Sequence, residues 1–271
     1  NHGNFMIYYL TIFNRRNIGS FSVIITTKRS VLILTKNNLS DLIAPYMSPW
    51  LSLDDKDWEP ILKDSSVKSY ERSTVIYQQG DVTPYVYLVK EGRVVLDLYG
   101  INGRRRSIYI ADKGTCFGEL ACLDQLGNYC TATTCTKTTL YLISKKRFTE
   151  EICQNPDFCM TLLKALSLKT RLITSLLEQM SFNDSNYRVY HSLLSLIQLY
   201  SVRLRDGSYK LNIKFTHQEM AYQTGLSRVS VSNIFLSLTN EGLIEKENGY
   251  LIVKDIQALK DYLIKDEWKE E

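Results

Sequence analysis

The sequence predicts an α+β protein in which an antiparallel β domain, a long helix and a smaller, mainly helical domain follow one another. Seven of the thirteen glycines fall between residues 80 and 127, where they separate short β-rich segments. An apolar repeat typical of a helix then covers 156–182, and a pair of helices broken by one glycine covers 217–238. The 271 residues leave room for two ordinary domains.

Residues 1–46 are predicted to be an N-terminal extension outside these domains. Because the chain starts at Asn1, we expect either an extension that packs on the main fold or a leader foreign to the protein. Its apolar run FMIYYLTIF has nine residues, too few to span a bilayer, so we expect no membrane role. The following SFSVIITTKRSVLILTK predicts two strands joined around Lys28.

Composition and charge exclude several classes of protein. The six cysteines, at 116, 122, 130, 135, 153 and 159, form no C-x-x-C pair, and the three histidines, at 2, 191 and 217, have no metal-ligand spacing with them. We therefore expect no metal, reduced thiols and a cytoplasmic location. The net charge of +4 comes wholly from residues 1–46, which hold five Lys/Arg and one acidic residue. Bulk charge therefore does not indicate a nucleic-acid partner.

Residues 47–154 are predicted to form the β domain. Its strands are expected in VYLVKEG, RVVLDLYG, RRSIYIAD and TLYLISKK. The glycine spacing is typical of a closed or sandwiched antiparallel sheet. Asn102 and Gly103 predict a hairpin turn. The arginines that follow, 104–106, either attract an anion or form a solvated tip.

A long helix is expected over 155–183, with Pro156 in its first turn. Its apolar residues are Phe158, Leu162, Ala165, Leu172 and Leu176. Their steps of four, three, seven and four are a heptad pattern. This stripe could be core against the β domain, but a helix of this length between two domains favours a symmetric dimer seam. Asp184 or Ser185 is expected to cap the next helix, 186–202.

A further pair of helices is expected on either side of a sharp turn. Thr216 can cap the first helix in a capping box with Glu219, and this helix ends at Thr224. Gly225 follows, where the chain needs a left-handed backbone that glycine adopts at little cost. Ser227 can cap the second helix.

The spacing within residues 184–271 predicts a winged helix-turn-helix. Small Ala221 lets two helices approach closely, and Gly225, Val231 and Ile234 follow it at the expected intervals. GLIEKENGYLIVKD then predicts two short strands that form a wing. An ordinary helical hairpin is the alternative, but it leaves unexplained the polar face at the start of the second helix. Side chains on that face, namely Arg228, Ser230, Ser232 and Asn233, can reach base edges in the major groove.

Three motifs together resemble a known family. These are GTCFGELACLD, the NPDF entry to the long helix, and THQEMAYQTGLSRVSVSNIFLSL with its wing. They resemble transcription regulators of the cyclic-AMP receptor protein and FNR type over roughly 50–265, and chains of that family usually begin near Met47. The resemblance implies a β-roll sensor domain of cupin or jelly-roll type, a dimerisation helix and a winged helix-turn-helix. It also implies a homodimer on an inverted-repeat DNA operator, RNA polymerase as a partner, and a small-molecule effector in the β-roll.

The resemblance also implies roles in DNA binding. Arg228 would read a guanine, which suits a guanidinium because it can bond O6 and N7 together. Thr216, Ser227 and Ser230 would contact phosphates, with Gln218 near the DNA backbone.

Two positions of the second helix depart from the family pattern. The family often has glutamate at 229 and arginine at 233, where this chain has Val229 and Asn233. Valine cannot accept a hydrogen bond from cytosine but can touch a thymine methyl, so the half-site is expected to differ. Ser232 completes the predicted DNA-binding set.

The effector site implied by the resemblance is only partly present. Gly118 and Glu119 match the glycine and the ribose-binding glutamate, but GNYCTATT lacks the arginine that holds the cyclic phosphate. Burying a phosphate charge without a cation beside it costs too much free energy, so cyclic AMP is disfavoured as the effector. Glu119 can instead have a structural role. On the long helix, Lys169 replaces an arginine and Ile173-Thr174 replaces a Thr-Ser pair. The candidate effector-binding residues are Gly118, Glu119, Leu120, Cys130, Thr131, Lys169 and Thr174.

Other chemistries find less support. No cysteine precedes 116, whereas an iron–sulfur member needs three there, and no histidine in the β domain could bind haem. A thiol switch among the cysteines at 116–135 stays open beside a role as small buried apolar residues. The sequence has no P-loop and no catalytic constellation, so we expect no enzyme. The alternative function is a cyclic-nucleotide-binding module that acts on a protein partner, which would need no winged helix.

Overall fold

The computed structural model describes residues 9–10, 22–27, 30–35, 50–51, 58–63 and 65–267. The chain divides into two compact units, residues 1–47 and 48–271. In the first unit, β1 (Tyr9–Leu10), β2 (Ser22–Thr27) and β3 (Ser30–Thr35) form one antiparallel sheet in that order. The two strands predicted around Lys28 are confirmed. Most of FMIYYLTIF lies outside the described residues, as does Met47.

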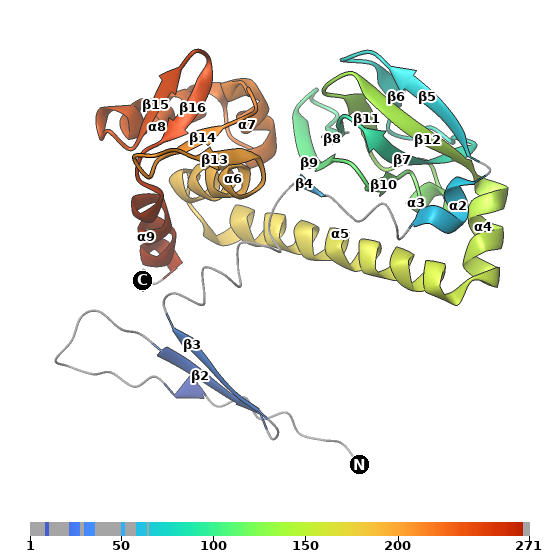
Figure 1. Ribbon diagram of the computed structural model, residues 1–271, viewed down its shortest axis with the longest axis horizontal. Helices are drawn as coiled ribbons and strands as arrows, with labels where there is room; N and C mark the ends of the chain where they lie inside the picture. The colour runs from blue at the N-terminus through green and yellow to red at the C-terminus, as the bar shows by residue number, and fades with distance from the viewer. Residues whose placement is uncertain are drawn as a thin grey trace. The chain divides into compact units, whose positions relative to one another are not determined.

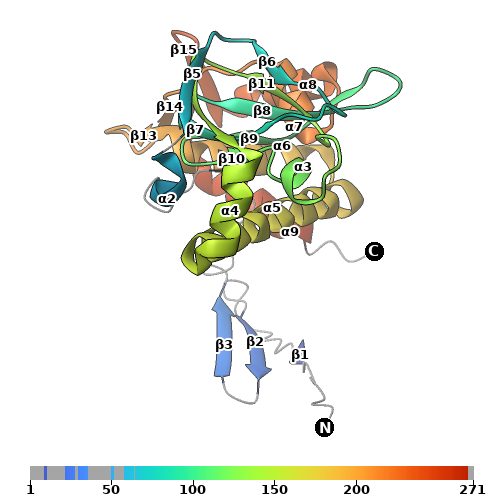
Figure 2. The same ribbon diagram turned by 90° about the vertical axis from the view of Figure 1, so that its right-hand side faces the viewer.

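In the second unit, two sheets face each other across an apolar core and form a β-roll (Figures 1 and 2). The first sheet has the order β10 (Cys116–Phe117), β7 (Tyr85–Glu91), β12 (Thr138–Ser144), β5 (Ser66–Tyr70). The second has the order β4 (Trp50–Leu51), β9 (Arg105–Ala111), β8 (Val94–Tyr99), β11 (Thr131–Thr134), β6 (Val75–Tyr77). Buried residues alternate along β9, as expected of a strand with one face on a core. The predicted β domain is confirmed, while the parallel pairing of β4 with β9 was not predicted.

Four helices accompany the β-roll: α2 (Glu59–Leu62), α3 (Leu120–Leu123), α4 (Lys145–Gln154) and α5 (Pro156–Phe182). The sequence predicts 155–183 for helix α5, which is one residue shorter at each end because Asn155 and Asn183 are extended caps. Asn155 caps it by accepting hydrogen bonds from the amides of Asp157 and Phe158, each at 3.1 Å. Helix α4 was not predicted; its cap is Ser144, which accepts from the Arg147 amide. Within the described part of the chain, no helix is both long and apolar enough to span a membrane.

The stripe of α5 predicted as a dimer seam packs instead against the β-roll of the same chain. Phe158, Leu162 and Ala165 are buried in one core cluster of the roll. Leu172 is buried in the other cluster, and the half-buried Leu176 packs against it. The dimer-seam assignment of these residues is therefore wrong, and the alternative of core against the β domain is correct. The heptad steps mark the face of α5 turned to its own core, because a helix buries its apolar stripe there.

The C-terminal part begins with α6 (Ser185–Tyr200), capped by the side chain of Asp184 as predicted. Helices α7 (His217–Thr224), α8 (Arg228–Asn240) and α9 (Ile256–Glu267) follow. A sheet has the order β13 (Ser201–Arg203), β14 (Tyr209–Leu211), β16 (Tyr250–Val253), β15 (Ile244–Glu247). Helix α6 was predicted to reach 202, but it stops at Tyr200 because Ser201 is extended and starts β13, which pairs with β14.

The core of this C-terminal part includes a histidine whose ionisation is suppressed. His191 of α6 is buried, and its ring stacks on that of Tyr187 with the centroids 6.1 Å apart. Burial lowers the pKa of His191 from 6.5 to about 4, because an imidazolium would lose its hydration there. The unfolded chain therefore binds more protons than the folded chain between pH 4 and pH 6.5.

We predict that this contribution to stability is complete above pH 6.5 and is lost as the pH falls towards 4. It should amount to about 3 kcal/mol of unfolding free energy, from the size of the pKa shift. Urea unfolding from pH 7 to pH 4 measures it as the difference between the wild type and His191→Leu. If both proteins lost stability with the same slope, the buried neutral imidazole would not be the cause.

Candidate DNA-binding and effector sites

Residues 216–227 form the first helix and the turn of a helix-turn-helix. The amide of Glu219 donates to Thr216 Oγ1 at 3.1 Å, and the amide of Thr216 donates to Glu219 Oε2 at 2.7 Å. This is the capping box that the sequence predicts. Helix α7 ends at Thr224, and Gly225 has a φ of 68°, in the left-handed region. A Cβ at Gly225 would also meet the guanidinium of Arg106, so contact and backbone both favour glycine.

Helix α8 exposes side chains of its first turn and packs its opposite face into the C-terminal core. Ser227 caps it by accepting from the Ser230 amide at 3.0 Å, and the hydroxyls of the two serines lie 2.8 Å apart. The buried face packs into the C-terminal core through Val231, Ile234, Phe235 and Leu238. On the outer face Arg228 and Asn233 are exposed, and Val229 is 68% exposed. Three predicted base-reading side chains therefore share one accessible surface.

Ser232 is placed differently from its neighbours. Its half-buried hydroxyl lies 2.8 Å from Nδ1 of His217, the first residue of α7. The His217 ring lies against Phe235, with the centroids 4.7 Å apart. Partial burial lowers the pKa of His217, and the cations Lys246 and Arg228 lower it further. Ser232 and His217 thus join the two helices, a contact between residues 15 apart in sequence that no local pattern reveals.

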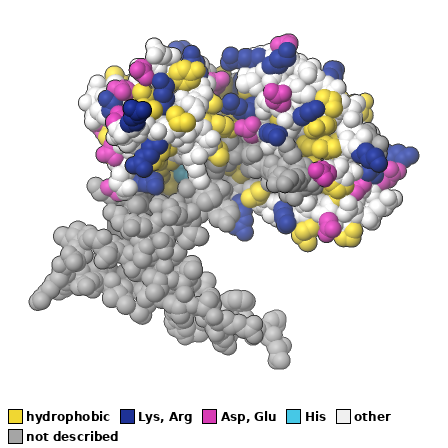
Figure 3. Space-filling view, in the orientation of Figure 1, with side chains coloured by type: hydrophobic (Ala, Val, Ile, Leu, Met, Phe, Trp, Pro, Cys, Tyr) yellow, Lys and Arg dark blue, Asp and Glu magenta, His cyan; other side chains and the backbone are white. Residues whose placement is uncertain are grey.

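The wing follows α8 as strands β15 and β16. Its turn residues Asn248 and Gly249 have φ of 52° and 82°, the two positive values that a tight hairpin needs. Gln218, predicted near the DNA backbone, lies half-buried in the first turn of α7. On the face in Figure 3, basic and acidic side chains are interspersed rather than separated by sign. This face therefore carries no large patch of one sign that would by itself indicate a DNA-binding surface.

Inside the β-roll, Lys169 of α5 forms a buried ion pair with Glu119. Lys169 Nζ lies 2.8 Å from Glu119 Oε1 and donates to the carbonyl oxygen of Cys116 at 2.7 Å. The two residues are 5% and 1% exposed. Burial alone would lower the pKa of Lys169, but Cys116 and Glu119 outweigh it and raise that pKa. The glutamate implied to hold a ribose hydroxyl is thus engaged by the chain's own lysine.

Tyrosines and a cysteine surround this pair. Tyr77, Tyr109 and Cys130 are buried in the same core cluster, and burial raises the pKa of each. Burial also raises the pKa of Tyr129. Within the described residues, Glu119 Oε2 has no hydrogen-bond partner. The strand pattern alone could place the tyrosines inside the roll, but only the three-dimensional structure brings them next to Glu119.

The other candidate effector residues are spread around this centre. Gly118 has a φ of 78° and lies close to the rings of Tyr77 and Tyr87. Thr131 is buried, and its hydroxyl accepts from the Gln79 amide at 3.0 Å. Leu120 is 36% exposed.

Two further positions correspond to those at which the family holds the phosphate and the base of a cyclic nucleotide. Asn128 stands in the stretch where the family has its phosphate-binding arginine; it is buried and donates to the carbonyl of Asp81 at 2.9 Å. Thr174 is exposed on α5 and bonds the carbonyl of Thr170. Neither side chain supplies a cation. The described residues contain no group of three His, Cys, Asp or Glu side chains arranged for a metal ion.

A β-roll joined by a long helix to a winged helix-turn-helix defines a class of two-domain DNA-binding proteins. The family model of the cyclic nucleotide-binding domain matches residues 67–155, and that of the Crp-like helix-turn-helix domain matches residues 187–262. The chain belongs to the CRP/FNR family of transcription regulators, as its motifs indicate. It binds DNA through the helix-turn-helix.

Curated relatives of this family are similar over most of their length. The cyclic AMP receptor protein of Thermus thermophilus is 28% identical over 192 residues, which cover 71% of this chain and 85% of the relative. The cAMP-activated global transcriptional regulator CRP of Haemophilus influenzae is 28% identical over 185 residues, 67% of this chain and 80% of its own.

Solved structures share the fold at lower identity. A CooA mutant from Carboxydothermus hydrogenoformans superposes with a TM-score of 0.65 at 22% identity, covering 75% of this chain and 90% of its own. The c-di-GMP responsive regulator CLP of Xanthomonas campestris superposes with a TM-score of 0.64 at 21% identity, covering 74% of this chain and 100% of its own.

We predict that Lys169→Met destabilises the protein by about 3–5 kcal/mol, because it leaves the buried Glu119 carboxylate without its counter-charge. Adding Glu119→Gln should restore part of this loss, since the double variant buries no charge. Urea unfolding of the two single variants and the double variant gives the coupling energy. Additive losses would mean that the ion pair does not hold α5 to the roll.

Proposed function

We propose that this regulator acts as a homodimer on an inverted-repeat operator, with Arg228 reading a guanine in each half-site. The observation that carries the proposal is the exposed start of α8, where Arg228 and Val229 stand on a helix fixed by its buried face. A guanidinium there can bond guanine O6 and N7, and Val229 can lie against a thymine methyl. Asn233, one turn further along α8, supplies a third base contact.

Phosphate contacts are assigned to the caps of the two helices. Thr216 begins α7 and Ser227 begins α8, so both hydroxyls lie beside free backbone N–H groups that attract an anion. Ser230 and Gln218 lie in the first turns of the same helices. These contacts fix the register of the protein on DNA without reading sequence.

The dimer is assigned to the outer face of α5, which carries a second apolar stripe. Leu163, Ile173, Leu177 and Met180 are exposed large hydrophobic residues, and Leu177 is 64% exposed. With Leu166, which is half-buried against the roll, and the polar, exposed Thr170, they follow one another at steps of three, four, three, four and three. This is the spacing of a two-stranded coiled coil, and burying it against a second copy removes the apolar surface from water. Two recognition helices would then enter successive major grooves about 34 Å apart.

The β-roll is assigned the role of a sensor that does not use cyclic AMP. Lys169 already pairs with the Glu119 carboxylate, the group that would bind a ribose hydroxyl, and Asn128 offers no positive charge to a phosphate. The unpartnered Oε2 of Glu119 among neutral tyrosines instead favours a compact effector with a hydrogen-bond donor. Such a regulator works on the chromosome together with RNA polymerase, which places its action in the cytoplasm.

We predict that Ile173→Glu combined with Leu177→Glu converts the dimer into monomers, because it places charges in the centre of the outer α5 stripe. Sedimentation velocity measures the mass of the species. Lys164→Glu, an exposed change on the same helix beside the stripe, is the control and should stay dimeric. A dimer that persists in the double variant would place the interface elsewhere.

We predict that Arg228→Ala weakens operator binding by about 1–3 kcal/mol per half-site and relaxes preference at one base pair only. Val229→Glu should move the neighbouring preference towards a cytosine, whose amine can donate to a carboxylate. Fluorescence anisotropy against single-base operator variants and random DNA, at fixed salt, separates these effects. Arg205→Ala removes an exposed arginine of the same domain outside α8 and should leave the preferences unchanged. An equal loss on specific and random DNA would make Arg228 a phosphate contact.

A further inference from the structure

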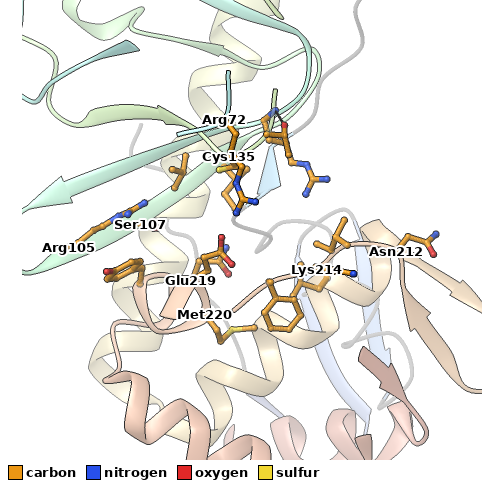
Figure 4. A pocket seen from close by; sticks show the side chains of 17 residues that line it. Arg72, Arg105, Ser107, Cys135, Asn212, Lys214, Glu219 and Met220 are labelled. Carbon is orange, nitrogen blue, oxygen red and sulfur yellow. Dashed lines mark hydrogen bonds between the residues drawn. The ribbon is translucent and has the colours of Figure 1, made fainter. Parts of the chain in front are cut away.

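A cavity of about 300 Å³ lies between the β-roll and the helix-turn-helix (Figure 4). Arg72, Arg105, Ser107 and Cys135 come from the β-roll side, and Asn212, Lys214, Glu219 and Met220 come from the C-terminal domain opposite. Neither Glu119 nor Lys169 lines it, and no residue of α8 does. It is therefore separate from the interior of the roll and from the DNA-reading surface.

The contacts that close this space are made by both domains. The guanidinium of Arg105 lies over the ring of Tyr222 in α7, 4.5 Å from its centroid. The guanidinium of Arg93 lies 5.0 Å from the ring centroid of Tyr200 at the end of α6, and the Tyr200 hydroxyl bonds the carboxylate of Asp112. The cavity is thus bounded by an interface with specific contacts.

The lining carries an excess of positive charge. It includes Arg72, Arg93, Arg105 and Lys214, against the single carboxylate of Glu219. Arg105 is paired with Asp97 at 2.8 Å, and Glu219 is engaged in the capping box with Thr216. Among the described residues, neither Arg72 nor Arg93 has an ion-pair partner. The exposed Arg72 and the half-buried Arg93 thus line the cavity without a carboxylate partner in the described part of the chain.

The rest of the lining mixes the polar residues Ser107, Thr136, Asn212 and Gln223 with six apolar ones. The apolar residues are Val95, Ile110, Leu196, Ile213, Phe215 and Met220. Cys135 also faces the space, and burial raises its pKa to about 11, so at neutral pH it is an uncharged thiol. The guanidinium groups together with the apolar side chains match a ligand that has an anionic end and an apolar body. The volume is at the lower end of the range of small-molecule sites.

We propose that this cavity binds a small phosphorylated metabolite with an apolar or aromatic body. Arg72 and Arg93 supply the cations for the phosphate, since a guanidinium binds phosphate oxygens through two parallel N–H···O bonds. The body of the ligand packs against the apolar side chains, among them Phe215 and Met220. A ligand held by both domains stabilises the arrangement in which α7 lies against β9. The site needs neither DNA nor an effector in the roll.

The test is calorimetric titration of the full chain, without DNA, using phenyl phosphate as the probe. We expect Arg72→Gln and Arg93→Gln each to weaken binding by about tenfold or more, the usual loss for a hydrogen bond to a charged group. Arg104→Gln, which removes an exposed arginine from the nearby hairpin, should leave the affinity unchanged. Phenol and inorganic phosphate should each bind at least about tenfold more weakly, because each lacks half of the complementary surface.

A second measurement locates the probe without any substitution. Phenyl phosphate should slow alkylation of Cys135 by iodoacetamide, followed by mass spectrometry, and should leave the exposed Cys153 unaffected. Absence of binding, equal affinity in all three arginine variants, or protection of both cysteines alike would each overturn the proposal. Inorganic phosphate that binds as tightly as phenyl phosphate would overturn the assigned ligand class. None of these outcomes depends on whether Arg228 reads a base.

Discussion

The buried ammonium of Lys169 is the constraint on which the arrangement of the sensor depends. It fills the seven-residue step of the inner α5 stripe, between Ala165 and Leu172, where an apolar side chain would otherwise stand. A cation at that depth must be paired, and the carboxylate of Glu119 and the carbonyl of Cys116 supply the partners. Sliding α5 by one turn would leave both charges buried and unpaired. The ion pair therefore fixes the register of the long helix on the roll, which apolar packing alone would hold less strictly.

This fixed register determines what the outer face of α5 can do. With Phe158, Leu162 and Leu172 committed to the roll, the stripe from Leu163 to Met180 points away from it. One helix thus carries two heptad patterns offset around its axis. The sequence shows both, since apolar residues at 162 and 163, or 172 and 173, are adjacent. Periodicity alone cannot say which pattern meets the β domain, and the sequence prediction assigned to a dimer the pattern that packs on the roll.

The helix-turn-helix could be predicted from sequence because its signals are local. The site inside the sensor domain could not, because it depends on contacts between residues far apart in the chain. The capping box of Thr216, the left-handed Gly225 and the cap at Ser227 depend on residues a few positions apart, so their patterns can be recognised in the sequence. The Lys169–Glu119 pair joins positions 50 apart, and β4 reaches β9 from a distant part of the chain. Helix α4 was missed because its signal is one serine cap after a strand that runs up to it.

The hairpin arginines show how far composition can mislead. The sequence offered an anion-attracting cluster or a solvated tip, and Arg104 is indeed exposed. Arg106, however, is half-buried with its guanidinium against the α7–α8 turn, and within the described residues its buried Nη1 has no hydrogen-bond partner. Burial and the neighbouring Arg188 lower its pKa to about 10, so its positive charge is held there at a cost.

The charge of Arg106 is one of several terms in the contact between the two domains. The ring contact of Arg105 with Tyr222 and the Tyr200–Asp112 hydrogen bond favour the observed contact, whereas the unpaired charge of Arg106 opposes it. A ligand that prefers one arrangement by about 5.5 kcal/mol can move a population from one per cent to ninety-nine. An anion that bridges the domains, or an operator that engages α8, acts on this interface only through such a difference in affinity between the two arrangements.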